Sequence, residues 1–204
     1  MTRGFPILLA LVLASGLAAL AFETEGFRVA TTAGARQLAV ARAPRLLPDV
    51  RLVDQDGEPF SLAAYRGRPM LIDFIYTRCP TLCGVLGDDL ERVERLIDAA
   101  GAPTPFDLLS ISFDPQNDDR EALRLYGERF GAKPPHWRIA APADAAGLAA
   151  LLQSFGVVVI PDGLGGFAHD DAIYLVDGQG RLARILEADE PNQLLADISE
   201  LMRP

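Results

Sequence analysis

The chain has 204 residues, of which 50% are hydrophobic and 23% are charged, and its formal net charge is −9 at pH 7. This length and composition are typical of one globular domain with extensions. A chain this acidic lacks the basic surface that nucleic acid binding requires, and two cysteines are too few for a disulfide scaffold.

The first predicted element is an uncharged run from residue 4 to residue 22, with Arg3 before it and Glu23 after it. The run is close to the ~20 apolar residues that span a bilayer, and Ala19-Leu20-Ala21 offers a site for signal peptidase. The flanking charges favour a cytoplasmic N-terminus. We therefore expect residues 1–22 to be a signal peptide or a single membrane anchor of a protein exported to the bacterial periplasmic side. Either it is cleaved and the protein released, or it holds the protein at the inner membrane.

Residues 23–44 show no clean hydrophobic period, and we expect a linker or tether. In the following segment, VRLVDQDGEPFSL (50–62) has two alternating runs around Asp56-Gly57, which predicts a β-hairpin. MLIDFIY (70–76) predicts a buried central strand. Pro80 suits the first turn of a helix that should run to about Ala100. Its apolar residues recur near helical spacing: Leu82, Leu86, Val93 and Ile97.

The second half continues the alternation of strands and helices. FDLLSISF (106–113) predicts a strand, and Asn117-Asp118 should cap a helix that Gly131 ends. The predicted inner face of that helix consists of Ala122, Leu123, Tyr126 and Phe130. The remaining predicted elements are a helix from Asp144 to Phe155, strands at 172–177 and 181–187, and a helix from Pro191 to Met202. This order predicts an α/β, thioredoxin-like fold for residues 45–204, with a central mixed sheet, flanking helices and an extra N-terminal β-hairpin.

Both cysteines, Cys79 and Cys83, come directly after the predicted strand 70–76. In such sheets the chemistry collects at the carboxyl ends of the strands. Two side chains four residues apart share a helix face, and a helix N-terminus lowers the pKa of a thiol. A disulfide closing so short a loop would constrain the unfolded chain little. A redox pair and a soft-metal site therefore remain as the functional alternatives.

A histidine, His169, precedes the predicted strand 172–177 in G-G-F-A-H-D-D. Thioredoxin-like oxidoreductases carry a proline before the corresponding strand, and this loop has none. Two sulfurs and one nitrogen suit copper as Cu(I) or Cu(II), whereas structural zinc usually takes four ligands. The neighbouring glycines and aspartates predict a mobile polar loop. The other histidine, His136, is predicted to be a connector residue without a metal.

Several motifs together resemble the SCO/SenC family. They are FIYTRCPTLC, LVDQDGEPFSL before it, SFDP with RFG after it, and the distant histidine before YLVDGQGRL. The resemblance implies a membrane-tethered, thioredoxin-like copper protein that helps assemble the dinuclear copper site of cytochrome c oxidase. It implies one copper per chain bound by Cys79, Cys83 and His169. The implied partners are the oxidase subunit that carries the copper site and another periplasmic copper chaperone. Gly84 and Asp170 depart from the residues common in the family.

Four further residues are candidates for supporting the metal ligands. Asp170 or Asp171 could orient the imidazole, Asp114 could act similarly or serve as a turn residue, and Tyr76 could wall the site or simply pack. The leading hypothesis is a metallochaperone rather than an enzyme. The rival is a thiol–disulfide oxidoreductase that reduces cysteines of an exported copper protein. A weaker third hypothesis is a peroxidase-like protein that uses Thr77 and Arg78.

Overall fold

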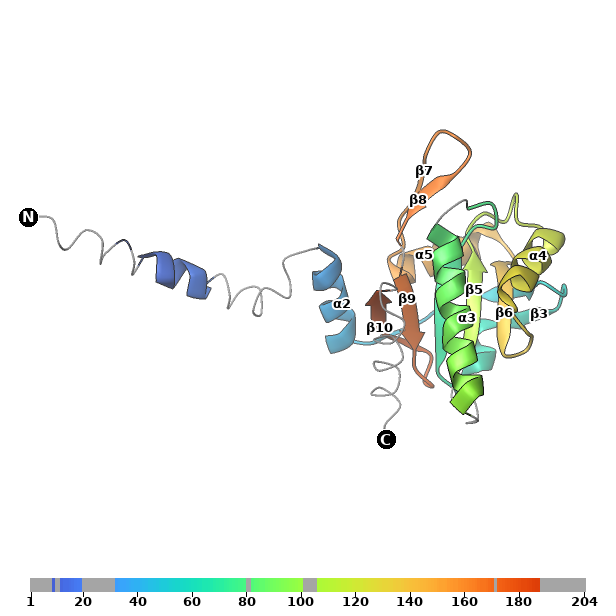
Figure 1. Ribbon diagram of the computed structural model, residues 1–204, viewed down its shortest axis with the longest axis horizontal. Helices are drawn as coiled ribbons and strands as arrows, with labels where there is room; N and C mark the ends of the chain where they lie inside the picture. The colour runs from blue at the N-terminus through green and yellow to red at the C-terminus, as the bar shows by residue number, and fades with distance from the viewer. Residues whose placement is uncertain are drawn as a thin grey trace, which may run out of the picture. The chain divides into compact units, whose positions relative to one another are not determined.

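The chain divides into two units, residues 1–43 and residues 44–204, in a computed structural model (Figure 1). The structure describes residues 9, 12–19, 32–79, 82–100, 106–170 and 172–187. For residues 82–85, 96–100 and 187 it describes the backbone alone.

The first unit contains helix α2 (Thr32–Arg42), in the segment where we expected a linker. Its sequence, TAGARQLAVAR, is rich in alanine and arginine, which favour helix without any hydrophobic period. No helix among the described residues is long and apolar enough to cross a bilayer. Most of the predicted span at 4–22 lies outside the described residues, so the signal or anchor stays a prediction.

The second unit is built on an eight-stranded sheet with the order β1-β10-β9-β4-β5-β6-β2-β3. The neighbours β4, β5 and β6 are parallel and the other pairs are antiparallel, which confirms the predicted mixed sheet. The strands are β1 (Arg45–Leu46), β2 (Arg51–Asp54), β3 (Pro59–Ser61), β4 (Met70–Ile75), β5 (Asp107–Ser112), β6 (Trp137–Pro142), β9 (Ala172–Val176) and β10 (Arg181–Glu187). The short 3-10 helix η1 (Leu62–Tyr65) links β3 to β4.

The predicted N-terminal hairpin is the pair β2–β3, which turns at Gly57 with a φ of 82°. A positive φ is strained for residues with a side chain, so Gly57 suits the turn. Strand β6 was not predicted. It continues the parallel order from β5 and also pairs with β2, so it joins the hairpin to the rest of the sheet.

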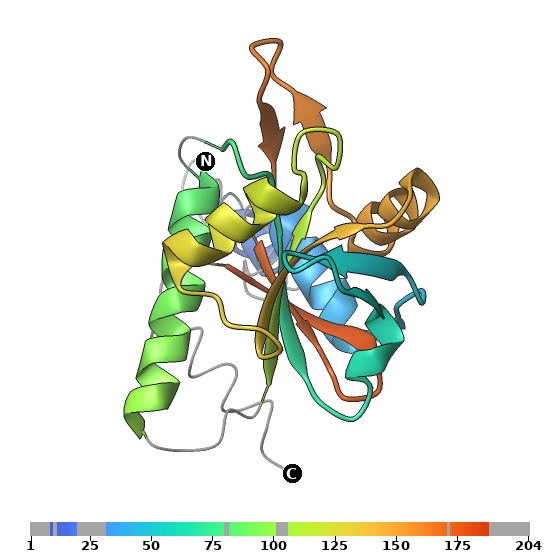
Figure 2. The same ribbon diagram turned by 90° about the vertical axis from the view of Figure 1, so that its right-hand side faces the viewer.

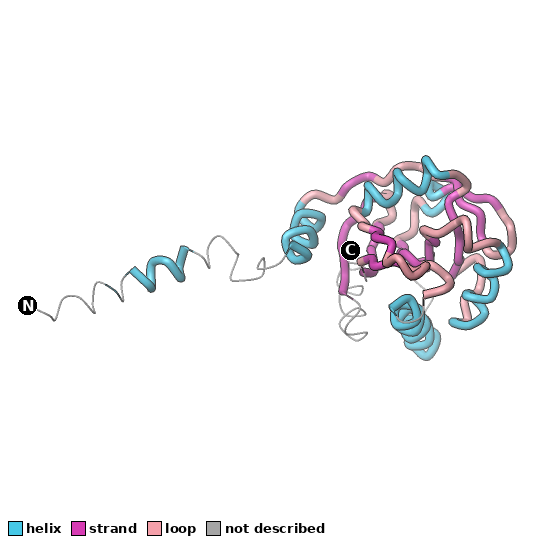
Figure 3. The backbone as a smooth tube through the Cα atoms, turned by 90° about the horizontal axis from the view of Figure 1, so that it is seen from above, coloured by secondary structure: helices cyan, strands magenta, loops and turns pink. Residues whose placement is uncertain are grey.

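Helices cover both faces of the sheet (Figures 2 and 3). α3 (Leu82–Ala100) and α4 (Arg120–Phe130) lie on one face, and α5 (Ala145–Phe155) lies on the other. A Cβ atom on Gly87 of α3 would lie 2.8 Å from the ring of Phe130, so glycine permits this close approach of α3 and α4. On the opposite face, Phe155 packs edge to face on Phe74 of β4, with ring centroids 5.1 Å apart.

The ends of α4 correct one prediction and confirm another. The N-cap is Asp119, whose carboxylate accepts a hydrogen bond from the N–H of Ala122. The predicted cap, Asn117-Asp118, was therefore wrong. Gly131 ends α4 with a φ of 72°, as predicted. On the predicted inner face, Leu123, Tyr126 and Phe130 are buried, whereas Ala122 is half-buried.

Strand β4 is buried along its whole length, and one of its six residues is a carboxylic acid. Asp73 has no exposed surface and lies opposite Ser110 of β5. Neither carboxyl oxygen has a hydrogen-bond partner, and the Ser110 hydroxyl oxygen accepts the indole N–H of Trp137 at 3.1 Å. Burial raises the pKa of Asp73 from 3.8 to about 7, and the nearby Ser110 hydroxyl opposes part of the rise.

A second, two-stranded sheet stands out from this domain at the end where α3 begins (Figures 1 and 2). It consists of β7 (Val159–Pro161) and β8 (Phe167–His169), paired antiparallel. We did not predict this hairpin, although the Asp162-Gly163 turn between apolar runs is a hairpin signal. The helix predicted at 191–202 lies outside the described residues.

Candidate metal centre

The cysteine loop begins at the carboxyl end of β4. Tyr76 follows the strand, and the N–H of Cys79 donates to the Tyr76 carbonyl at 3.1 Å. The side chain of Cys79 is half-buried. Cys83 lies in the first described turn of α3, and its side chain is not among those described. The position of the cysteines at the carboxyl edge of parallel strands is the one that the sequence predicted.

A buried carboxylate holds the middle of this loop. Asp118 is 2% exposed and accepts hydrogen bonds from the N–H of Thr77 at 3.0 Å and from its hydroxyl at 2.6 Å. The hydroxyl of Ser112, at the end of β5, donates to the same carboxylate. Asp118 therefore joins the loop after β4 to the end of β5, and this role was not predicted.

The next residue of the loop is held by a second carboxylate. Arg78 forms an ion pair with Asp114 at 2.8 Å, and the side-chain amide of Asn117 also donates to Asp114. The carbonyl of Asp114 accepts the N–H groups of Asn117 and Asp118, so Asp114 is a turn residue that also binds Arg78. Thr77 and Arg78, named as peroxidase candidates, thus take part in anchoring the loop.

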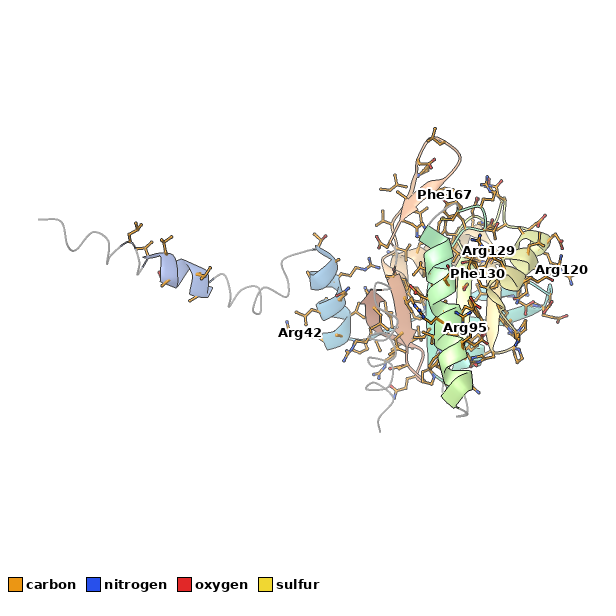
Figure 4. The ribbon with its side chains drawn as sticks, viewed as in Figure 1. Arg42, Arg95, Arg120, Arg129, Phe130 and Phe167 are labelled. Atoms are coloured by element: carbon orange, nitrogen blue, oxygen red, sulfur yellow. The ribbon has the colours of Figure 1, made fainter. Side chains whose placement is uncertain are left out.

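The imidazole of His169 packs against aromatic rings. It packs edge to face on Phe113 at 4.9 Å and on Tyr76 at 6.0 Å between ring centroids. Phe167, labelled in Figure 4, contacts the same two rings at 5.5 Å and 5.2 Å. The expectation of a loop without packing was wrong, because His169 ends strand β8 and its ring packs on the aromatic cluster of Tyr76 and Phe113.

The ring nitrogens of His169 have different roles. Nδ1 lies 3.0 Å from the carbonyl oxygen of Asp170. A carbonyl can only accept, so Nδ1 carries the hydrogen and the neutral ring has its lone pair on Nε2. The backbone carbonyl of Asp170 therefore orients the imidazole. Asp171 lies outside the described residues.

Tyr76 connects the hairpin to the cysteine loop. It is 3% exposed, its ring contacts His169, and its hydroxyl accepts the N–H of Phe167 at 3.4 Å. Its carbonyl accepts the N–H of Cys79. One residue thus contacts both the histidine and the cysteine segment. No group of three His, Cys, Asp or Glu side chains arranged for a metal occurs among the described residues, which do not include the side chain of Cys83.

The other histidine lies near the opposite ends of the strands. Nδ1 of His136 is 3.4 Å from the carboxylate of Asp107, the first residue of β5. The carboxyl end of β5, where Phe113 meets His169, is the other end of that strand. His136 is therefore a natural control for experiments on His169.

These features define a thioredoxin-like domain in which a histidine on a projecting hairpin packs on Tyr76, the residue that begins the segment with the cysteines. The chain belongs to the SCO1/SenC family, whose model matches residues 39–203. This confirms the resemblance found in the sequence.

Relatives and solved structures agree with this assignment. The SCO1 homologue of Bacillus subtilis is 26% identical over 64% of this chain and 68% of its own length. The chain spans less than half of the mammalian SCO2 homologues that it also matches. Bradyrhizobium japonicum ScoI with copper bound superposes with a TM-score of 0.63 and 27% identity, over 76% of this chain and 98% of that one. BsSco, described as having a disulfide switch and belonging to a family of cytochrome c oxidase assembly proteins, gives a TM-score of 0.66 at 22% identity, over 77% of this chain and 93% of that one.

Proposed function

We propose that this protein is a copper metallochaperone that binds one copper ion through Cys79, Cys83 and His169. One observation carries the proposal. His169 is oriented by the Asp170 carbonyl so that Nε2 can act as a ligand, and it packs on the loop of Cys79 through Tyr76. Thiolate and imidazole donors fit copper in both of its common oxidation states. When bound, copper is the cargo that the protein delivers.

The delivery step we propose is assembly of the dinuclear copper site of cytochrome c oxidase. Family membership supports this, together with the copper-bound ScoI structure and the description of BsSco as an oxidase assembly protein. The partners would be the oxidase subunit with that site and a periplasmic chaperone that supplies the metal. The apolar segment 4–22 supports an exported protein that is anchored in the inner membrane or released by cleavage.

Thiol–disulfide exchange with a copper-protein client is the second candidate. It is favoured by the half-buried side chain of Cys79, which is partly accessible, and by the disulfide switch named for BsSco. In this reaction a thiolate attacks a client disulfide, forms a mixed disulfide and releases the other client sulfur as a thiolate. The chain's two cysteines then become the disulfide as the client is reduced.

Anaerobic titration of the reduced chain with Cu(I) and Cu(II) tests the proposal. We expect one copper per chain, and none at this site in a Cys79→Ser, Cys83→Ser double variant. His169→Ala should lose Cu(II) affinity by at least the ~10–100-fold typical of altered outer-shell groups, and should retain Cu(I) on the two sulfurs. His136→Ala is the matched control and should bind as the wild type does. Equal copper binding by the double cysteine variant would exclude this site.

Reduction potentials separate the two candidates. Disulfide exchange depends on thiolate fraction and access, so His169→Ala should keep a near-normal potential. If that variant also supports full oxidase assembly in cells, thiol exchange becomes the better account.

A further inference from the structure

The tip of the β7–β8 hairpin has a defined shape. The carboxylate of Asp162 accepts the N–H groups of Leu164 at 2.7 Å and Gly166 at 2.9 Å, and these bonds lower the pKa of Asp162. Gly163 and Gly165 have φ values of 76° and 91°, which residues with side chains rarely adopt. This turn holds Leu164 outward with 93% of its surface exposed.

The hairpin has an inner face that packs on the aromatic cluster and an outer face that is exposed. Val159 pairs with His169 and Ile160 pairs with Ala168, and directly opposite residues of an antiparallel pair point to the same side. The inner face carries His169 and Phe167, which pack on the aromatic cluster. The outer face is apolar and exposed; it consists of Ala168, with Val158 and Ile160 exposed to 56% and 57%.

The hairpin segment and its flanks carry charged residues of one sign only. The segment 156–172 contains three aspartates and neither lysine nor arginine. An anionic lipid surface attracts basic segments, so it is a poor match. A second copy of this chain would bring the same aspartates against these. A protein surface with an apolar pocket bordered by lysine or arginine is complementary in both respects.

We propose that the outer face and Leu164 form the docking surface for the protein that exchanges copper with His169. This rests on the proposed function. During ligand exchange the ligands of both proteins reach the same ion, so the hairpin that carries His169 borders their contact. The hydrogen bonds of Asp162 restrain the tip before the partner binds, which reduces the entropy lost on binding. Exposed apolar side chains that gather on one face mark a site of protein–protein interaction.

The test uses the full chain and the copper-free copper-site domain of the oxidase subunit from the same organism. Calorimetry without copper gives their Kd for the wild type and for an Ile160→Gln, Leu164→Gln double variant. Both positions are exposed, so the fold should persist, which circular dichroism checks. We expect Kd to rise at least about tenfold, as for buried interface anchors, and to rise for the wild type when salt is added. Leu125→Gln is the matched control: Leu125 is a 52% exposed leucine on α4, and its replacement should leave Kd unchanged.

Copper titration of the same variants keeps this proposal distinct from the proposed function. Unchanged copper affinity in the double variant shows that the hairpin acts on docking alone. If the wild type binds no copper, the metallochaperone function is refuted. The docking surface is still tested separately, because its Kd values are measured without copper. Equal Kd values, or no binding by the wild type, overturn the docking proposal. Two other outcomes would also overturn it. One is a wild-type dimer that the double variant does not form; the other is wild-type sedimentation with phosphatidylglycerol and phosphatidylethanolamine vesicles that the double variant loses.

Discussion

Replacing Asp73 by asparagine should stabilise the protein at neutral and alkaline pH. The carboxyl group is fully buried in the central strand, and burial raises its pKa from 3.8 to about 7. The folded state therefore holds this proton over a pH range in which the unfolded chain has released it. Between about pH 4 and pH 7 the free energy of unfolding of the wild type falls as pH rises, because the native state binds more protons.

The magnitude follows from the two pKa values. Each pKa unit corresponds to about 1.36 kcal/mol, so keeping Asp73 buried above pH 7 costs about 4 kcal/mol. Asparagine has nearly the same shape and does not titrate. Any constant penalty of the amide cancels when the variant and the wild type are compared at two pH values.

Urea unfolding followed by circular dichroism at pH 4 and pH 8 measures the effect. The difference in unfolding free energy, Asp73→Asn minus wild type, should increase by roughly 3–4 kcal/mol from the lower to the higher pH. Asp162→Asn is the control. Backbone hydrogen bonds lower the pKa of Asp162 from its ordinary value of 3.8, so its contribution is lost only below that value and the difference should change little between pH 4 and pH 8. A difference for Asp73→Asn that is the same at both pH values would refute the reasoning.

Three further outcomes are expected. Asp118→Ala leaves the N–H and hydroxyl of Thr77 without their acceptor, and it should lower the free energy of unfolding in urea by about 2–4 kcal/mol. Asp119→Ala, which removes the α4 cap, should lower it by about 1 kcal/mol. Equal losses would show that Asp118 does not anchor the loop. Gly87→Ala places a methyl group 2.8 Å from the Phe130 ring and should cost about 1–3 kcal/mol, and an unchanged midpoint would mean that α3 shifts freely. Copper affinity should weaken in acid, because both thiols and the imidazole must lose protons to bind; a titration that is flat with pH would argue against these ligands.

Local patterns in the sequence determined most of the architecture. The alternating runs around Asp56-Gly57, the apolar run at 70–76 and the glycine at 131 specify hairpin, strand and helix end through backbone and side-chain preferences of neighbouring residues. Cys79 follows its strand directly, so its place at the carboxyl edge follows from chain order. His169 was predicted as a ligand from residue type and its position before β9, and that role stays a prediction.

Only the tertiary structure decided which distant residues contact the residues of the site and which carboxylates are buried. Asp118 contacts Thr77 across 41 positions of sequence, and Phe167 reaches Tyr76 across 91. Periodicity carries no information on such pairs, because they form when separate strands end at the same edge of the sheet. Asp118 and Asp119 are equally suitable as local caps of α4. Only the packing of the loop that contains Thr77 determines that Asp118 is buried and Asp119 is the cap. Asp73 differs from a surface aspartate solely by the strands and helices that enclose it, and that enclosure changes its pKa.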